Sequence, residues 1–293
     1  MSQLKNILFL SFILAMAFSL TGCGQKKRRS TDIRLNKDLS EDDAIEAEYK
    51  FGWMAGTNKK YKVAILQFKK VLRKSPNHVG ATHDLGLTYA KLGKLDKAIE
   101  YFQKTLDLRP NHSEAYFNLS SIFFRLNQAP QALQYLKQCL RFSPNHPKGL
   151  LRLAELDLSN GRQRDAISNL SKYLKVKPYD LKVRAKLGGV YFQQGLDENA
   201  KVELKKAIRQ IHTPRVYYQL GVIYHRQGHL KAARYFYEKT IKEDPNHSDC
   251  LISLGEVYEQ YGLRGKALVH YERAYGFEPE NEYLRSKLSK LRR

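Results

Sequence analysis

Cysteine is scarce in this 293-residue chain, which contains only Cys23, Cys139 and Cys250. Three widely spaced cysteines cannot form the disulfide framework that holds small secreted domains together. The fold must therefore be stabilised by packing, and hydrophobic residues, at 42% of the chain, are sufficient for a sizeable core.

Sequence signatures of catalysis are also missing. The chain contains no G-x-x-x-x-G-K-[ST] phosphate loop, no G-x-S-x-G nucleophile motif and no H-E-x-x-H zinc motif. We therefore predict that the protein is not an enzyme and needs no cofactor.

Acidic residues are in the minority. The 29 Asp and Glu residues face 51 Lys and Arg residues, which leaves a net charge of +22. Such an excess favours acidic partners, namely an acidic protein face, an anionic lipid or polysaccharide, or nucleic acid. It carries no information about the fold.

The N-terminus has the organisation of a targeting signal. Lys5 precedes an apolar run from Ile7 to Leu20, and Leu20-Thr21-Gly22-Cys23 resembles the lipobox of bacterial lipoproteins. The resemblance implies removal of a signal peptide at residues 1–22 and lipidation of Cys23. Gly24 stands where these lipoproteins carry Asp when they stay in the inner membrane, so the resemblance implies the outer membrane.

A basic cluster, Lys26-Lys27-Arg28-Arg29, gives an alternative. By the positive-inside rule it favours an uncleaved helix with the rest of the chain in the cytoplasm. The apolar run is short for a span, which needs about 20 residues, and the lipobox is the more specific signal. We therefore expect a bacterial envelope protein, lipid-anchored and facing the periplasm from the outer membrane, with residues 23–40 as a lipidated, basic and flexible tether.

Internal repetition dominates the rest of the sequence. Pro76, Pro110, Pro144 and Pro178 are 34 positions apart, and Pro245 and Pro279 continue the series after a slip of one residue. Counting back 31 positions from each proline gives the repeat starts. Within the repeats, the residue at position 8 has a small side chain and the residue at position 24 has a large one. Position 20 is alanine throughout: Ala64, Ala98, Ala132, Ala166, Ala200, Ala233 and Ala267.

This pattern resembles the tetratricopeptide repeat family over about 235 residues. The resemblance implies an all-α, right-handed superhelical solenoid of helical hairpins, in which small residues at positions 8 and 20 let two helices approach closely. The predicted organisation is seven repeats within residues 41–279, at about 45–78, 79–112, 113–146, 147–180, 181–213, 214–247 and 248–279, followed by a capping helix at 280–293. Glycines at position 15 are expected to end the first helices.

The family resemblance also implies a binding groove lined by the first helix of each repeat. Carried onto this chain, the groove residues are Tyr49, Trp53, His83, Phe117, Phe124, Arg125, Lys148, Lys182, Phe192, Arg215, Tyr218, His225 and Arg226. Aromatic rings beside cations fit a protein or peptide of acidic and apolar character. Asp249, Glu256 and Glu259 are expected to attract the basic end of the same ligand. The alternative for Phe117 and Phe124 is packing between neighbouring hairpins.

Four Pro-Asn-His triplets, at 76–78, 110–112, 144–146 and 245–247, raise the question of a metal. Zinc–nitrogen bonds of about 2.0–2.1 Å require convergent ligands, whereas packed helices lie about 8–10 Å apart. We therefore predict no metal site and assign the triplets to turns, with asparagine as the turn-forming residue. Cys139 and Cys250 are expected to be structural and unpaired.

The combined features predict a lipid-anchored protein–protein interaction scaffold. A lipobox, a short tether and a repeat array resemble the layout of pilotin-like lipoproteins of type IV pilus systems, which assist an outer-membrane secretin. One alternative is a binder of anionic lipid, lipopolysaccharide or cell-wall polymer through a basic convex face formed by the second helices. Another is a cytoplasm-facing scaffold, if the N-terminal helix is not cleaved; export leaves no role for nucleic acid.

Overall fold

The computed structural model describes residues 40–292, and every regular element in that range is an α-helix. The chain divides into two compact units, Met1–Pro76 and Asn77–Arg293. The signal peptide predicted at 1–22, Cys23 and the tether as far as residue 39 lie outside the described residues. Between residues 40 and 292 no helix is long and apolar enough to cross a membrane.

The described part of the first unit is a single hairpin of α2 (Glu41–Thr57) and α3 (Tyr61–Lys74). The hydroxyl of Ser40 accepts a hydrogen bond from the Asp43 N–H at 3.1 Å and donates to the Asp43 carboxylate at 2.9 Å. This arrangement is an N-cap, which satisfies a backbone donor at the start of α2. The two helices approach closely at the glycines of α2: a Cβ on Gly52 would lie 2.8 Å from the Phe68 ring, and one on Gly56 would lie 3.8 Å from Ala64.

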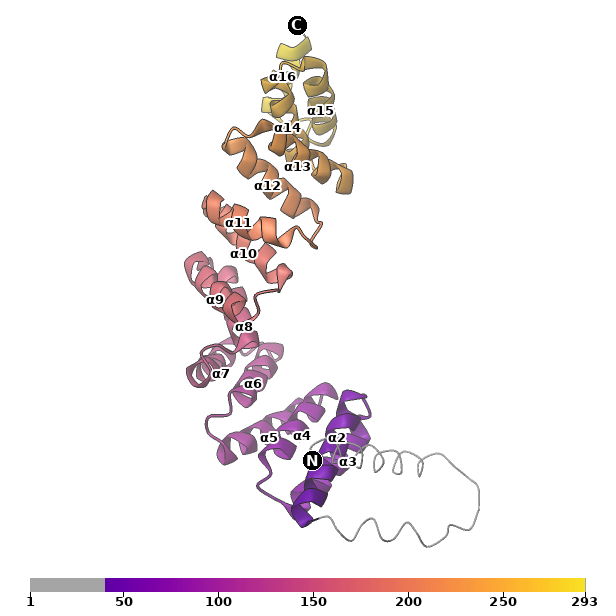
Figure 1. Cartoon of the computed structure of the whole chain (residues 1–293), viewed down its shortest axis with the longest axis vertical. Coiled ribbons are helices and arrows are strands. Elements are labelled where there is room, and N and C mark those ends of the chain that lie inside the picture. The colour runs from indigo at the N-terminus through magenta and orange to yellow at the C-terminus, as the bar shows by residue number, and fades with distance from the viewer. Residues whose placement is uncertain (1–39, 293) are drawn as a thin grey trace, which may run out of the picture. The chain divides into compact units, whose positions relative to one another are not determined.

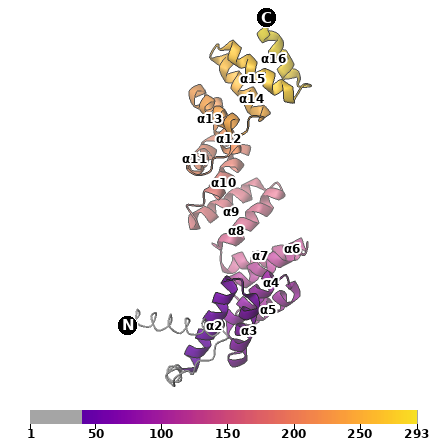
Figure 2. The ribbon, with the colours of Figure 1, turned by 90° about the vertical axis from the view of Figure 1, so that its right-hand side faces the viewer.

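The second unit consists of six hairpins and a final helix (Figures 1 and 2). Their helices are α4 (Val79–Lys91), α5 (Leu95–Leu108), α6 (Ser113–Arg125), α7 (Ala129–Phe142), α8 (Pro147–Ser159), α9 (Gln163–Val176), α10 (Leu181–Gln193), α11 (Asp197–Ala207), α12 (Pro214–Arg226), α13 (Leu230–Glu243), α14 (Ser248–Gln260), α15 (Arg264–Phe277) and α16 (Glu282–Arg292). Each second helix also packs on the first helix of the next hairpin. The predicted solenoid of paired helices is confirmed.

Each hairpin closes on a small residue at position 8. A Cβ added to Gly221 would lie 2.5 Å from the Tyr237 ring, and one on Gly188 would lie 2.7 Å from Leu204. Tyr237 and Leu204, both at position 24, are fully buried. The pattern of small and large residues therefore reports a real contact, in which helix backbone lies against a large side chain.

The turn after each first helix needs a left-handed residue. Gly93, Gly161, Gly195, Gly228 and Gly262 adopt φ between 69° and 73°, as expected for helix-ending glycines. Where the repeat lacks this glycine, Lys59 (φ 60°) and Asn127 (φ 58°) take the same conformation.

The Pro-Asn-His turns differ from our expectation, because the histidine is the functional residue of the turn. The Nδ1 atom of His112 accepts the Ala115 N–H at 3.2 Å, and that of His146 accepts the Gly149 N–H at 3.0 Å. His78 and His247 cap α4 and α14 in the same way. Each imidazole is therefore the N-cap of a first helix, a role that ordinarily falls to Ser, Thr, Asp or Asn.

The array departs from a regular repeat at two places, the fifth repeat and the C-terminus, and the sequence is irregular at both. In the short fifth repeat, α11 has 11 residues, whereas α13 in the next hairpin has 14. At the C-terminus, α16 lies on α15 and buries Leu284 and Leu288, so the predicted capping helix is confirmed. Leu291 adds a partly buried contact to the same cluster.

The close contact at position 8 predicts that Gly221→Ala destabilises the protein. The new methyl group would overlap the buried Tyr237 ring, and overpacking of this kind typically costs about 1–3 kcal/mol. Gly276→Ala in α15 is the matched control, since a Cβ there meets nothing within 4 Å. Urea unfolding followed by circular dichroism should show a loss of stability for the first variant only; equal stabilities would contradict the packing argument.

The His112 cap predicts that the protein becomes less stable as the pH is lowered. Burial, and then the charges of His83 and Arg109, lower the pKa of His112, whose Nδ1 must be unprotonated to cap α6. The unfolded chain therefore binds the proton more readily, and stability present above about pH 6.5 is lost as the pH falls through the lower folded pKa.

We expect His112→Asn to keep the cap and to lose less stability than the parent protein between pH 7.5 and pH 5. His112→Ala, which has no cap, should be less stable than both at pH 7.5. Chemical unfolding at the two pH values measures this, and an unchanged pH dependence in His112→Asn would show that His112 contributes nothing to it.

Candidate functional site

The side of the second unit that its first helices present is here called the inner face. Some neighbouring first helices contact one another directly, namely α4 with α6, α10 with α12 and α12 with α14. This is the surface on which the sequence places the binding residues. Tyr49 and Trp53 belong instead to the first unit, where Trp53 is 54% exposed and the Tyr49 ring lies 6.0 Å from that of Phe68.

On the inner face, cations lie over aromatic rings of the preceding hairpin. The Lys148 ammonium is 5.8 Å from the Phe117 ring centre, and the Arg226 guanidinium is 5.1 Å from that of Phe192. Arg152, which sequence analysis did not single out, lies 5.6 Å from the Phe124 ring. These cation–π contacts link successive hairpins. The sequence analysis assigned these cations and rings to a ligand. The structure shows that some of them bind one another instead.

Two of the candidate rings also support the histidine caps. The Phe117 ring lies 5.2 Å from that of His146, and the Tyr218 ring lies 4.6 Å from that of His247. The rings of His83 and His112 make the equivalent contact at 4.9 Å. The alternative expected for Phe117, packing between hairpins, is therefore observed.

The remaining candidates vary in how far they are engaged by the protein itself. His225 lies 3.1 Å from the Gln260 amide, and Arg226 pairs with Asp197 at 3.1 Å. Arg125 and Lys182 are exposed, and within residues 40–292 neither has an ion-pair partner. The cations free to meet a ligand are thus fewer than the sequence indicates.

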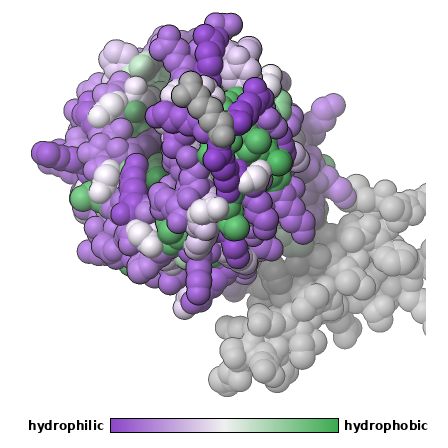
Figure 3. All heavy atoms as spheres, turned by 90° about the horizontal axis from the view of Figure 1, so that it is seen from above, coloured by the Kyte–Doolittle hydropathy of each residue, from purple (hydrophilic) through white to green (hydrophobic). Residues whose placement is uncertain are grey.

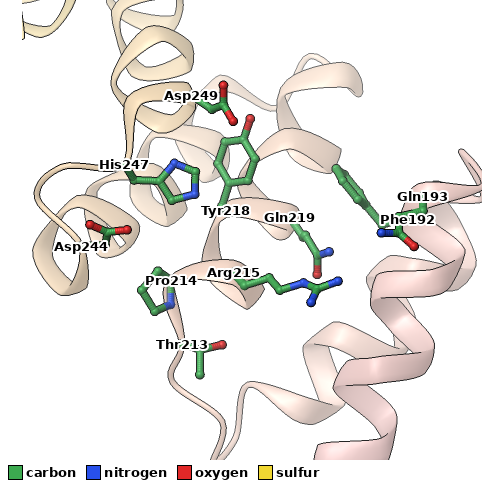
Figure 4. Close-up of a pocket in the computed structure, with 10 residues that line it drawn as sticks. All are labelled: Phe192, Gln193, Thr213, Pro214, Arg215, Tyr218, Gln219, Asp244, His247 and Asp249. Atoms are coloured by element: carbon green, nitrogen blue, oxygen red, sulfur yellow. The ribbon is translucent and has the colours of Figure 1, made fainter. Parts of the chain in front are cut away.

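A hollow of about 520 Å³ opens on the inner face where the fifth, sixth and seventh hairpins meet (Figure 4). Its lining residues are Phe192, Gln193, Thr213, Pro214, Arg215, Tyr218, Gln219, Asp244, His247 and Asp249. Phe192, Arg215, Tyr218 and Asp249 were expected on the binding face, and the structure brings them together. Gln219 was missed, because a glutamine on a helix carries no signal of its environment in the sequence.

The hollow has walls of opposite charge. Arg215 and Gln219 extend from α12 towards the side where Phe192 lies, whereas Asp249 and His247 gather beside Tyr218 (Figure 4). Burial, and then the charge of Asp249, raise the pKa of Tyr218. The Tyr218 hydroxyl therefore stays protonated at neutral pH.

The other acidic residues expected at this end of the groove are engaged by the capping helix. Glu256 accepts a hydrogen bond from the Tyr283 hydroxyl at 2.6 Å, and Glu259 pairs with Lys287 at 2.6 Å. Burial opposes ionisation of Glu259, but the hydrogen bonds from Lys287 and Tyr271 outweigh it and leave its pKa below the usual range. Among the three acids, Asp249 is the one that lines the hollow.

Neither metal chemistry nor thiol chemistry gains support from the described residues. Between residues 40 and 292 no three His, Cys, Asp or Glu side chains are placed to hold a metal ion. Cys139 and Cys250 are buried, unpaired thiols, and burial raises the pKa of each to about 12. Both are therefore protonated components of the core.

Comparison with known proteins identifies the repeat. Residues 78–145 and 214–247 each match a family model described as tetratricopeptide repeat. Anaphase-promoting complex subunit 3 of Schizosaccharomyces pombe is 28% identical over 95 residues, which is 32% of this chain and 14% of that protein. The chain thus covers well under two thirds of this curated relative.

Solved structures resemble the chain in fold. Part of a TPR repeat-containing protein from Cytophaga hutchinsonii has a TM-score of 0.56 at 18% identity, with 82% of this chain and 99% of that chain covered. MamA from Desulfovibrio magneticus RS-1 has a TM-score of 0.50 at 22% identity, with 58% and 96% covered. PilF of Pseudomonas aeruginosa has a TM-score of 0.49 at 18% identity, with 73% and 96% covered. Likeness at this level of identity indicates the fold alone.

Proposed function

We propose that this chain, a tetratricopeptide-repeat protein, is a scaffold that binds a linear segment of another protein along its inner face. The observation that carries the proposal is the hollow of about 520 Å³ between hairpins five, six and seven. It offers the apolar ring of Phe192 beside Arg215, whose side chain has no ion pair or hydrogen bond within residues 40–292. The proposed role is binding, not catalysis.

We further propose that the scaffold is anchored in the bacterial envelope through lipidated Cys23. The lipobox-like Leu20-Thr21-Gly22-Cys23 supports this, together with the basic segment that follows it. Residues 24–40, fully extended, would reach about 60 Å, enough for the repeats to meet a partner away from the lipid surface. The basic side chains of the segment fit anionic headgroups.

Within the envelope, we propose assistance to the assembly of an outer-membrane machine, such as a type IV pilus secretin. The support is the layout of the sequence, which joins a lipobox and a short tether to a repeat array. The structural likeness to PilF adds nothing to this part of the proposal, which concerns the pathway and not the fold.

A second candidate function uses the opposite face. Val202, Tyr235 and Val269, all at position 22 of consecutive second helices, are 48%, 53% and 53% exposed. Exposed lysines Lys205 and Lys206 follow Val202 on α11. The end of the molecule that Figure 3 shows from above is mainly hydrophilic, with hydrophobic residues in small separate groups. Apolar side chains among cations suit an anionic lipid or polymer surface, and binding there would collapse with salt.

Charge reversal tests the inner face. Lys182→Glu combined with Arg215→Glu should abolish capture of partner proteins from detergent-solubilised envelopes by the immobilised full chain, because both cations face an acidic ligand. Quantitative mass spectrometry of the captured proteins measures the loss. Helicity and thermal unfolding should stay close to those of the parent protein, since both side chains are exposed.

The matched control is Lys205→Glu with Lys242→Glu, which changes the charge equally on second helices. It should retain capture at physiological salt. If the control variant loses capture and the inner-face variant keeps it, the second-helix face is the working surface and the groove proposal is wrong.

Lipidation is tested independently at Cys23. Mass spectrometry of the N-terminal peptide from membrane fractions should show an acylated Cys23 in the native chain. Cys23→Ala should release the protein from the membrane without changing its fold, because residue 23 is not part of the helical hairpins, which begin at Glu41. Recovery of an intact Met1 with an unmodified Cys23 would contradict the anchor and place the search for partners in the cytoplasm.

A further inference from the structure

One buried glycine packs against two residues that line the hollow. Gly189 occupies position 9 of its repeat, where the other hairpins of the second unit carry Leu87, Ser121, Glu155, Val222 and Glu256. A Cβ on Gly189 would lie 3.4 Å from the Gln219 amide nitrogen and 3.6 Å from the Arg215 guanidinium. A branched side chain at this position would therefore crowd both groups.

Gln219 is buried without a partner. Its side chain lines the hollow, the residue is 5% exposed, and within residues 40–292 no hydrogen bond engages its amide. Its amide atoms are not sealed from the hollow, so the amide is available to bond to a ligand that enters there. An amide N–H beside a guanidinium is a donor pair that suits a carboxylate.

The start of α12 also lines the hollow. The first helices α4, α6, α8, α10 and α14 each have a side-chain cap, whereas Thr213 at the start of α12 makes no such hydrogen bond. Thr213 and Pro214 both line the hollow, with Pro214 on the side of Asp244 (Figure 4). The helix start thus adds an electropositive end to the hollow without a side-chain cap.

The hollow also carries negative charge, which disfavours a polyanion. Asp244 and Asp249 line it, and in the described chain Asp249 has no ion-pair partner. A polyanion that spans the hollow would meet these carboxylates as well as Arg215. A peptide that carries a carboxylate and a cation a few residues apart meets only opposite charges.

We propose that this hollow is the anchor of the partner segment, taking an Asp or Glu side chain at Arg215 and Gln219 and a Lys or Arg side chain at Asp249. An apolar residue beside the carboxylate would lie on Phe192. The two charged walls fix the direction of the segment, with its acidic residue towards the fifth hairpin and its basic residue towards the seventh. This inference rests on the proposed groove function.

A random linear dodecapeptide library displayed on phage and selected on the immobilised full chain provides the probe. We expect selected peptides to share an acidic and a basic residue at a fixed spacing. Arg215→Gln should weaken binding of a labelled selected peptide by about tenfold or more, the loss expected for a charge-assisted hydrogen bond. Asp249→Arg should change the selected basic residue to an acidic one and leave the other position unchanged.

Gly189→Val tests whether peptide binding can be blocked without unfolding the protein. Valine should crowd the Gln219 amide and the Arg215 guanidinium, the groups nearest its Cβ, and reduce peptide affinity by at least about tenfold. Ser121→Val, at the same position of the third hairpin, is the matched control and should leave affinity unchanged. Circular dichroism and thermal unfolding verify both folds, and the Asp249→Arg selection provides a separate test on an exposed residue.

The outcomes distinguish the anchor from the groove. If the Lys182 and Arg215 charge reversal abolishes protein capture, but Gly189→Val and Asp249→Arg leave peptide affinity and selection unchanged, the groove stands and the anchor is wrong. If the charge reversal also leaves capture unchanged, both proposals fail. Selected peptides without an acidic preference would overturn the anchor on their own.

Discussion

The structure depends on the contact between a small residue at position 8 and a large side chain at position 24 of each repeat. At Gly221 and Gly255 the neighbouring tyrosine ring occupies the space that a Cβ would take. This contact sets how closely the two helices of a hairpin approach. The hairpin spacing in turn determines which side chains reach the next hairpin. The cation–π contacts and the hollow, which join side chains of successive hairpins, depend on that spacing.

Much of the fold could be predicted because the same residue types recur at the same positions of every repeat. The period, the alanines at position 20 and the helix-ending glycines identify the hairpins, and Leu284 and Leu288 identify the capping helix. The histidine caps could not be predicted. An imidazole acts as an N-cap only when its rotamer brings Nδ1 to the backbone, and the sequence favoured asparagine for the turn.

The candidate site was predictable in outline and not in detail. Register alone places Arg215, Tyr218 and Asp249 on one face. Sequence cannot show that Glu256 and Glu259 are engaged by Tyr283 and Lys287, since those contacts form only when α16 folds back. Gln219 and Gly189 gave no signal either, because one is an unpaired polar group and the other an absent side chain. Both become meaningful only beside their neighbours.

The capping helix has a consequence for assembly. Every hairpin presents one side to its predecessor and the other to its successor, so an uncovered last hairpin would accept the first hairpin of a second molecule. Addition of this kind repeats without limit and leads to filaments. Leu284 and Leu288 of α16 occupy the stacking surface of the seventh hairpin. What this hairpin presents to its surroundings is therefore the polar and basic side of α16 rather than an apolar stacking surface.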